Sequence, residues 1–200
     1  AGAPKTVYSY AAYAGTSGTI NLLDTSTVTA TAGSPPSIAT KYAYDTAANG
    51  LVLLAQALDQ AGLNLITTYA YDGYGNQTMV KGPRTDVNDT VTTAYDNDRN
   101  PTTITYPLIS GSAPQIINTY NLNGWLTSTA RKLGANWMVD CTSYTASGQE
   151  DARFGPYKTA SATDCSFVGN TAVPKITYGY DGADRLITTT VSENAGDRVT

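Results

Sequence analysis

The chain of 200 residues carries 12 Lys and Arg against 16 Asp and Glu, which gives a formal net charge of -4. Binding to a phosphate backbone requires clustered positive charge, so nucleic acid is not an expected partner. Histidine is absent, so the chain lacks the side chain most often used for proton transfer near neutral pH, which is also the commonest metal ligand.

The apolar residues favour strands and give no sign of membrane insertion. There are 15 Tyr but only two Phe and two Trp. Tyrosine is common in strands, and it suits surfaces where the ring packs while the hydroxyl reaches a polar partner. The longest apolar stretch, residues 51–55, is far shorter than the roughly 20 residues that cross a bilayer.

Along the chain, six segments align on one tyrosine in steps of 27, 24, 25, 24 and 36 residues. A recurring period of this kind indicates a repeat architecture. The aligned residues are Tyr44, Tyr71, Tyr95, Tyr120, Tyr144 and Tyr180. The motif core is Tyr-x-Tyr-Asp in Tyr42–Asp45, Tyr69–Asp72 and Tyr178–Asp181. The copies at Tyr95-Asp96 and Tyr120 match this core less closely, and the copy at Tyr144 matches it least. Residues 7–10 give a degenerate seventh copy near Tyr10.

The segment after the first motif, residues 51–62 (LVLLAQALDQAG), is the one place where a helix competes. It has good helix formers and ends on Gly62, a suitable C-cap. Its position in the repeat predicts a strand instead.

Turn residues follow the motifs. The segments 72–76, 96–100, 121–124 and 181–185 are rich in Asp, Asn and Gly, which tolerate positive φ or bond their own backbone. Alternating β-branched runs such as 186–190 then predict a second strand. Gly82-Pro83 and Gly155-Pro156 are expected to close the hairpins, so each unit reads strand, tight turn, strand, looser turn.

Carboxylates in these turns and loops are not expected to form sites. Asp96, Asp98 and Asn100 match the start of a calcium loop, but Pro101 and Pro107 stand where that loop needs Gly and Glu. The pairs Glu150-Asp151 and Asp86 with Asp89 are nominal candidates for glycoside hydrolysis, and solvated loops explain them better. We therefore expect no enzyme, with no catalytic residue, metal or cofactor.

Cys141 and Cys165 are 24 residues apart, which is one repeat length. In a stacked array this spacing could bring them together on adjacent strands, so we expect a disulfide that ties down the lengthened last repeat. The alternative is two unrelated thiols. A disulfide would favour an oxidising, extracytoplasmic setting.

A Tyr-Asp motif followed by a Gly or Asn turn, recurring among Thr-rich strands from about Tyr42 to Thr190, resembles the RHS (YD) repeat family. The resemblance implies an all-β fold: repeated antiparallel hairpins of about 24 to 27 residues in a spiralling sheet, or β-solenoid, that forms part of a hollow shell. More distant relatives have the teneurin-type YD barrel. The bacterial shells enclose a toxic C-terminal domain, and the self-cleaving Asp-Pro-x-Gly-Leu-like segment of their larger members does not occur here.

On this interpretation residues 1–200 form a single array, an excerpt of a longer chain, exported to the outside or surface of a bacterial cell. The motif tyrosines and aspartates have packing roles, and the partners are other repeats of this chain or identical chains, with an enclosed toxin domain. The alternative is an adhesion or fibre-forming module that self-associates through sheet edges into a filament, or binds surface glycans on its tyrosine stripe.

Overall fold

The computed structural model describes residues 5–15, 18–29, 38–45, 52–60, 63–108, 111–166, 173–193 and 196–199. These residues form fifteen strands and no α-helix. The fold is all-β and antiparallel, as the sequence predicts. None of the described segments is a helix long and apolar enough to cross a membrane.

The chain divides into two compact units, Ala1–Thr92 and Thr93–Thr200, called here the N-terminal and C-terminal units. The N-terminal unit contains β1 (Lys5–Gly15), β2 (Gly18–Thr29), β3 (Ile38–Asp45), β4 (Val52–Gln60), β5 (Leu65–Tyr71), β6 (Gln77–Lys81) and the start of β7 (Thr90–Tyr95). Each of these strands pairs antiparallel with the next one along the chain.

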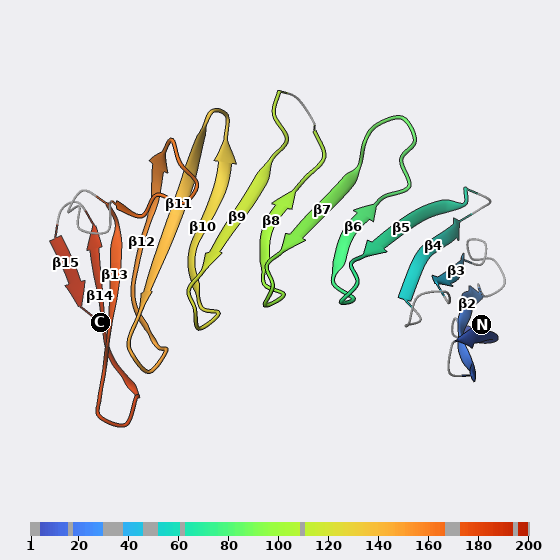
Figure 1. Cartoon of the computed structure of the whole chain (residues 1–200), viewed down its shortest axis with the longest axis horizontal. Coiled ribbons are helices and arrows are strands. Elements are labelled where there is room, and N and C mark those ends of the chain that lie inside the picture. The colour runs from blue at the N-terminus through green and yellow to red at the C-terminus, as the bar shows by residue number, and fades with distance from the viewer. Residues whose placement is uncertain are drawn as a thin grey trace. The chain divides into compact units, whose positions relative to one another are not determined.

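The C-terminal unit continues from the end of β7 in the same way. It contains β8 (Pro101–Thr105), β9 (Gln115–Tyr120), β10 (Leu126–Leu133), β11 (Asn136–Tyr144), β12 (Glu150–Thr159), β13 (Lys175–Tyr180), β14 (Leu186–Glu193) and β15 (Gly196–Val199). From β8 to β15 every strand pairs antiparallel with its chain neighbour, and Figure 1 shows these strands following one another in chain order.

Strand β4 confirms the strand prediction for the segment with good helix formers. It pairs with β3 on one side, where Gln56 opposes Tyr42, and with β5 on the other, where Gln56 opposes Thr67. β4 pairs with β3 along most of its length and with β5 over residues 55–58, and this tertiary pairing outweighs the local helix propensity.

The buried core lies on one face of β10, β11 and β12. Alternate residues of β11 are buried, and Val139 is 0% exposed. The sheet contributes Ala130, Trp137, Val139, Cys141, Ala152 and Phe154 to this cluster. The connection between β12 and β13 covers it with Ala162 and Val173. Among the side chains that the structure describes, all those that are buried belong to the C-terminal unit.

The two Gly-Pro pairs have different roles. Gly82-Pro83 opens the connection after β6, as expected, but Gly155-Pro156 lies inside β12 and closes no hairpin. The register passes from Val139 opposite Tyr157 to Cys141 opposite Phe154, so the pair forms a bulge against β11. Gly155 has a φ of 114°, and a Cβ there would lie 2.6 Å from the Val139 carbonyl oxygen. The prediction of a strand end was wrong because the long partner β11 continues beyond this point, and bulges are where strands accept proline.

Candidate functional site: the hairpin turns, the tyrosine contacts and the disulfide-anchored loop

The motif aspartate caps the turn that follows it. The Asp72 amide donates to the Asn76 carbonyl at 3.0 Å, and the Gly75 amide donates to the Asp72 carbonyl at 3.1 Å. The Asp72 carboxylate accepts from the amides of Tyr74 and Asn76, both at 2.9 Å, and from Asn76 Nδ2 at 2.8 Å. This side chain therefore satisfies the backbone donors that the tight turn leaves free.

The same turn recurs with different capping residues in the C-terminal unit. Closing amide-to-carbonyl bonds join Asp96 to Asn100, Asn121 to Trp125, Thr145 to Gln149 and Asp181 to Arg185, at 2.9–3.0 Å. Asp96 Oδ1 accepts from the amides of Asp98 and Asn100, so Asp96 caps this turn as Asp72 caps its own. Asn121 Oδ1 and Thr145 Oγ1 take the place of the carboxylate in their own turns.

Hydrogen bonds lower the pKa of the three capping aspartates below its ordinary value. The Asn76 side chain is the main cause at Asp72, the Asn100 amide at Asp96, and the Arg185 amide at Asp181. Each donor stabilises the ionised carboxylate, so these turns hold the aspartates in their charged form.

The fourth residue of each turn is in the left-handed region. Its φ is 87° at Gly75, 77° at Gly124 and 90° at Gly148, but also 68° at Arg99 and 61° at Asp184. A type I turn followed by a left-handed residue is the usual three-residue hairpin loop. The return strands then contain a second irregularity, as at Thr78, which the register skips between Gln77 and Met79.

Three motif tyrosines of the C-terminal unit join their hairpins to the preceding ones. Tyr120 donates its hydroxyl to the Pro101 carbonyl at 3.1 Å, Tyr144 to the Leu126 carbonyl at 2.7 Å and Tyr180 to the Glu150 carbonyl at 2.8 Å. Each acceptor is the fifth residue after the capping residue of the preceding turn. The contact is therefore a repeated feature that joins successive hairpins through the main chain.

Local irregularity of the return strand accompanies this contact. Leu126 and Glu150 each stand directly before the residue that the register skips, Thr127 and Asp151 respectively. A bulged residue is unpaired in the ladder and disrupts it locally, and here the main-chain oxygen beside it accepts a side-chain donor. These acceptor carbonyls could not be predicted from the sequence, because every residue type has a main-chain carbonyl.

The first hairpin follows the same pattern. Tyr44 donates to the Leu23 carbonyl at 3.0 Å, and Leu23 opposes Tyr10 directly before the skipped residue Asp24. Tyr10 thus has the register position that Tyr120 has opposite Leu126. The Tyr44 ring also meets Tyr13 edge-on, with centroids 5.3 Å apart.

Burial raises the pKa of Tyr44, Tyr120, Tyr144 and Tyr180 above its ordinary value, so all four hydroxyls stay protonated and available as donors.

The other motif residues lie in the strands as follows: Tyr42 opposes Gln56, Tyr69 opposes Val80, Tyr71 opposes Gln77, Tyr95 ends β7, Tyr178 opposes Thr189, and Asp45 opposes Val52.

The carboxylates considered as catalytic candidates are held by other groups. Arg84 binds Asp86 through two nitrogens, at 3.1 and 2.6 Å, and this pairing lowers the pKa of Asp86. Arg153 binds Glu150 in the same manner, at 2.8 and 2.6 Å. Asp151 accepts from Ser143 Oγ, and Asp89 accepts from the Arg84 amide.

An open groove of about 650 Å³ runs across β10 to β13. Two ion pairs stand in its lining, Arg131 with Asp140 and Arg153 with Glu150. The guanidinium and carboxylate charges of these pairs compensate one another, and Lys175, whose Nζ lies 5.2 Å from the centre of the Phe154 ring, adds one further positive charge to the lining.

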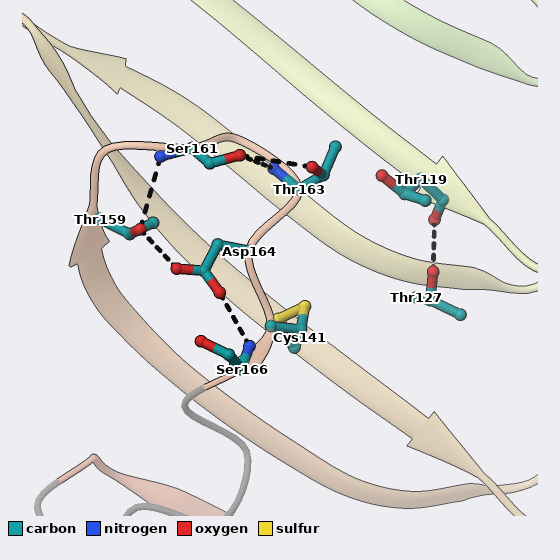
Figure 2. Close-up of a disulfide and its surroundings, with 9 residues drawn as sticks. Thr119, Thr127, Cys141, Thr159, Ser161, Thr163, Asp164 and Ser166 are labelled. Atoms are coloured by element: carbon teal, nitrogen blue, oxygen red, sulfur yellow. Dashed lines mark hydrogen bonds between the residues drawn. A yellow bond between two sulfur atoms is a disulfide. The ribbon is translucent and has the colours of Figure 1, made fainter.

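The two cysteines form a disulfide whose Cα atoms lie 6.1 Å apart. Cys141 is in β11, whereas Cys165 lies in the connection between β12 and β13 and not on an adjacent strand as the spacing suggested. The bond therefore ties a loop to the sheet face, as Figure 2 shows. A cavity of about 240 Å³, lined by both cysteines together with Phe154 and Thr163, lies beside it.

Comparison with known proteins gives a fold likeness alone. No protein-family model matches the sequence, and no curated protein matches it. A crystal structure of TcdB2-TccC3 matches with a TM-score of 0.67 and 15% identity, over 98% of this chain and 10% of that chain. TcdB2-TccC3-TEV (TM-score 0.47, 14% identity, 90% and 11% of the two chains) and the Photorhabdus luminescens Tc holotoxin pore with a TccC3 mutation (0.40, 11%, 90% and 12%) are also similar. The chain thus spans about a tenth of the first of these chains, and its fold occurs within it.

Proposed function

We propose that this chain is a non-catalytic wall segment of an RHS-type shell, which encloses or displays another domain. The observation that carries the proposal is the repeated contact between a motif tyrosine hydroxyl and a main-chain carbonyl of the preceding hairpin. Such a contact needs no special partner residue, so it can be repeated along an array of any length. A wall requires this kind of extension.

Two further observations support the proposal. The Tyr-Asp and turn pattern resembles the RHS (YD) repeat, and the fold is similar to part of TcdB2-TccC3. The motif residues have architectural roles in the structure: aspartates cap turns and tyrosines link hairpins. A non-catalytic role is also in keeping with carboxylates that are engaged by arginine or by turn amides.

In this proposal the partners are the neighbouring repeats of the same chain and an enclosed toxin domain. The protein is bacterial and acts outside the cell. The Cys141–Cys165 disulfide supports export, because structural disulfides persist in oxidising compartments. The second candidate function is a surface module that polymerises through strand edges or binds glycans. The following test distinguishes it from a shell.

The test uses the protein purified from its natural source. Its intact mass is measured, and the particles are imaged by negative-stain electron microscopy. A chain far longer than 200 residues in closed hollow particles is expected. A short chain in regular filaments would overturn the shell and make edge-to-edge assembly the function.

A second experiment links the wall to the tyrosine contacts. In the full-length protein, Tyr120→Phe, Tyr144→Phe and Tyr180→Phe are combined, which removes three hydroxyl donors while keeping the rings. We expect faster digestion by added protease of any domain inside the particle. Tyr106→Phe is the matched control, since this side chain is 38% exposed and lies outside the motif. Equal protection in both variants would count against the tyrosines as wall contacts.

A further inference from the structure

The loop between β12 and β13 is attached to the sheet mainly through one covalent bond. Thr159 ends β12 opposite Trp137, and from there to Ser166 the side-chain hydrogen bonds are internal: Thr159 Oγ1 donates to Asp164 Oδ2 at 2.8 Å, and the Ser166 amide donates to Asp164 Oδ1 at 2.9 Å (Figure 2). Ser161 Oγ and Thr163 Oγ1 pair with each other at 3.4 Å. This segment is thus folded upon itself, and hydrogen bonding contributes to its shape rather than to its attachment.

The non-covalent attachment of the loop is small. Ala162 and Val173 pack on the buried cluster, and the Gly155 amide donates to the Pro174 carbonyl at 2.9 Å. Ala162 is a short side chain with little apolar area to bury. The disulfide to Cys141 is therefore the strongest link between Thr159–Ser166 and β11.

The sheet beneath the loop has its own support. Cys141 stands between Ser128 of β10 and Phe154 of β12 in continuous antiparallel ladders. These backbone hydrogen bonds do not pass through the loop. Release of the loop would accordingly leave β10, β11 and β12 paired, while uncovering part of the apolar cluster around Phe154.

The two cysteine residues differ in burial. Cys141 is 3% exposed, but Cys165 is only partly buried and both line the open cavity of about 240 Å³. The cavity offers a small thiolate a route to the disulfide, and the less buried Cys165 is the expected point of attack, with Cys141 Sγ as the leaving group. Accessible disulfides are the labile ones in thiol exchange.

We propose that the Cys141–Cys165 disulfide is a redox latch, opened by a low-molecular-weight thiol of the glutathione class, that releases the loop from the apolar face of β10–β12. The thiolate attacks Cys165 Sγ, the S–S bond breaks, and Cys141 leaves as a thiolate that takes a proton from water. A second thiol attacks the mixed disulfide and returns Cys165 as a free thiol. Two thiols are oxidised to their disulfide, and the protein disulfide gains the two electrons.

The latch gives the C-terminal unit two states. In an oxidising medium the loop covers the cluster, and in a reducing medium such as a cytosol Phe154 and its neighbours become accessible. The inference does not depend on the shell, because it concerns only the described part of residues 128–174.

The experiment is hydrogen exchange read by mass spectrometry on the intact protein, before and after treatment with reduced glutathione under native conditions. Alkylation and mass measurement count the free thiols. We expect two new thiols, roughly tenfold faster exchange in 159–166 and unchanged exchange in the strand segments 128–133 and 137–144. The combined variant Cys141→Ser and Cys165→Ser should show the released pattern with or without glutathione.

Three results would overturn the inference. The bond could resist glutathione while the protein stays folded, or the loop could keep its protection after both thiols are freed. Exchange in β10 and β11 could also rise together with that of the loop, which would make the disulfide a staple for the whole sheet. If the double variant does not fold, the reduction of the natural protein still decides among these results.

Discussion

Individual residues in the motif have separable physical roles. Tyr144 shows why tyrosine recurs in place of phenylalanine: its ring packs on Trp125 with centroids 5.3 Å apart, while its hydroxyl reaches the Leu126 carbonyl. The ring contributes apolar contact within the unit and the hydroxyl fixes the preceding hairpin. Phenylalanine could supply the ring contact but not the hydroxyl donor, so only tyrosine makes both contacts.

Replacing Tyr144 with Phe should remove the hydroxyl contact and keep the ring. A typical hydrogen bond contributes about 1 kcal/mol to stability, so we expect a loss of that order in the free energy of unfolding. Chemical denaturation of the protein measures it. Tyr106→Phe is the control and should change stability by much less, and equal effects would show that the contact with Leu126 contributes nothing.

The capping aspartates predict an acid-sensitive fold. The pKa of Asp96 is lowered in the folded protein, first by the Asn100 amide and then by its side chain. A lowered folded pKa contributes stability above the unfolded pKa of about 4, and this stability is lost as the pH falls through the folded pKa. The hairpin should therefore weaken between neutral pH and strongly acidic pH.

The Asp96→Asn variant tests this, because Asn121 performs the same capping role in the next repeat. Its melting temperature should fall less on acidification than that of the natural protein. Asp98→Asn removes the same charge from the same turn without touching the cap. If the melting temperatures of both variants become less dependent on pH by the same amount, general charge effects rather than the cap are responsible.

At the scale of the hairpin, successive turns also contact each other. A Cβ on Gly148 would lie 2.6 Å from Trp125 Cζ2, so the Trp125 side chain of one turn occupies the space beside the next turn. Gln149 Nε2 donates to the Asp184 carbonyl at 3.0 Å and makes a similar connection one repeat later. Neighbouring hairpins are thus joined at their turns as well as through tyrosine.

Gly148→Ala and Gly124→Ala form a matched pair at this scale. Both glycines have positive φ, at 90° and 77°, but nothing lies within 4 Å of a Cβ on Gly124. Strain alone should cost about 1 to 2 kcal/mol at each site. Gly148→Ala should be clearly more destabilising than Gly124→Ala in thermal unfolding. Equal losses of stability would show that the Trp125 side chain does not restrict a Cβ at position 148.

Elements were predictable from the sequence where the information is local. The turns at Asp72 and Asp181 follow from residues within five positions, and the strands beside them follow from alternation. The tyrosine acceptor at Leu126 could not be predicted, because a carbonyl carries no sequence signal and lies in another hairpin. Gly155-Pro156 was misread because its bulge depends on the length of β11, and Cys165 lies in a loop whose path the repeat spacing does not describe.

At the scale of the whole molecule, every described pairing joins strands that are neighbours in the chain. Each hairpin therefore draws its stability from the hairpins beside it, which is the behaviour of a linear array. The buried cluster of β10–β12 adds stability to the C-terminal unit alone. The disulfide links two residues of this region that are 24 positions apart in the sequence. By loop-closure entropy, a cross-link of this span stabilises by about 3 to 4 kcal/mol.

This arrangement predicts that damage stays local. Val139→Ala removes volume from a fully buried position and should cost about 2 kcal/mol. Hydrogen exchange should rise in β10, β11 and β12 while β5 and β6 keep their protection. A uniform rise along the chain would mean that the array unfolds as one cooperative body instead.

The main-chain acceptors of the tyrosine contacts have a consequence for how such genes change. Because Pro101, Leu126 and Glu150 are unrelated in chemistry yet accept the same donor, a hairpin inserted by duplication can make this one contact with its predecessor without a matching mutation in the acceptor residue. Unequal recombination between copies would lengthen or shorten the array and leave an acceptor carbonyl at each junction. The hydroxyl contact therefore sets no limit of its own on the number of hairpins.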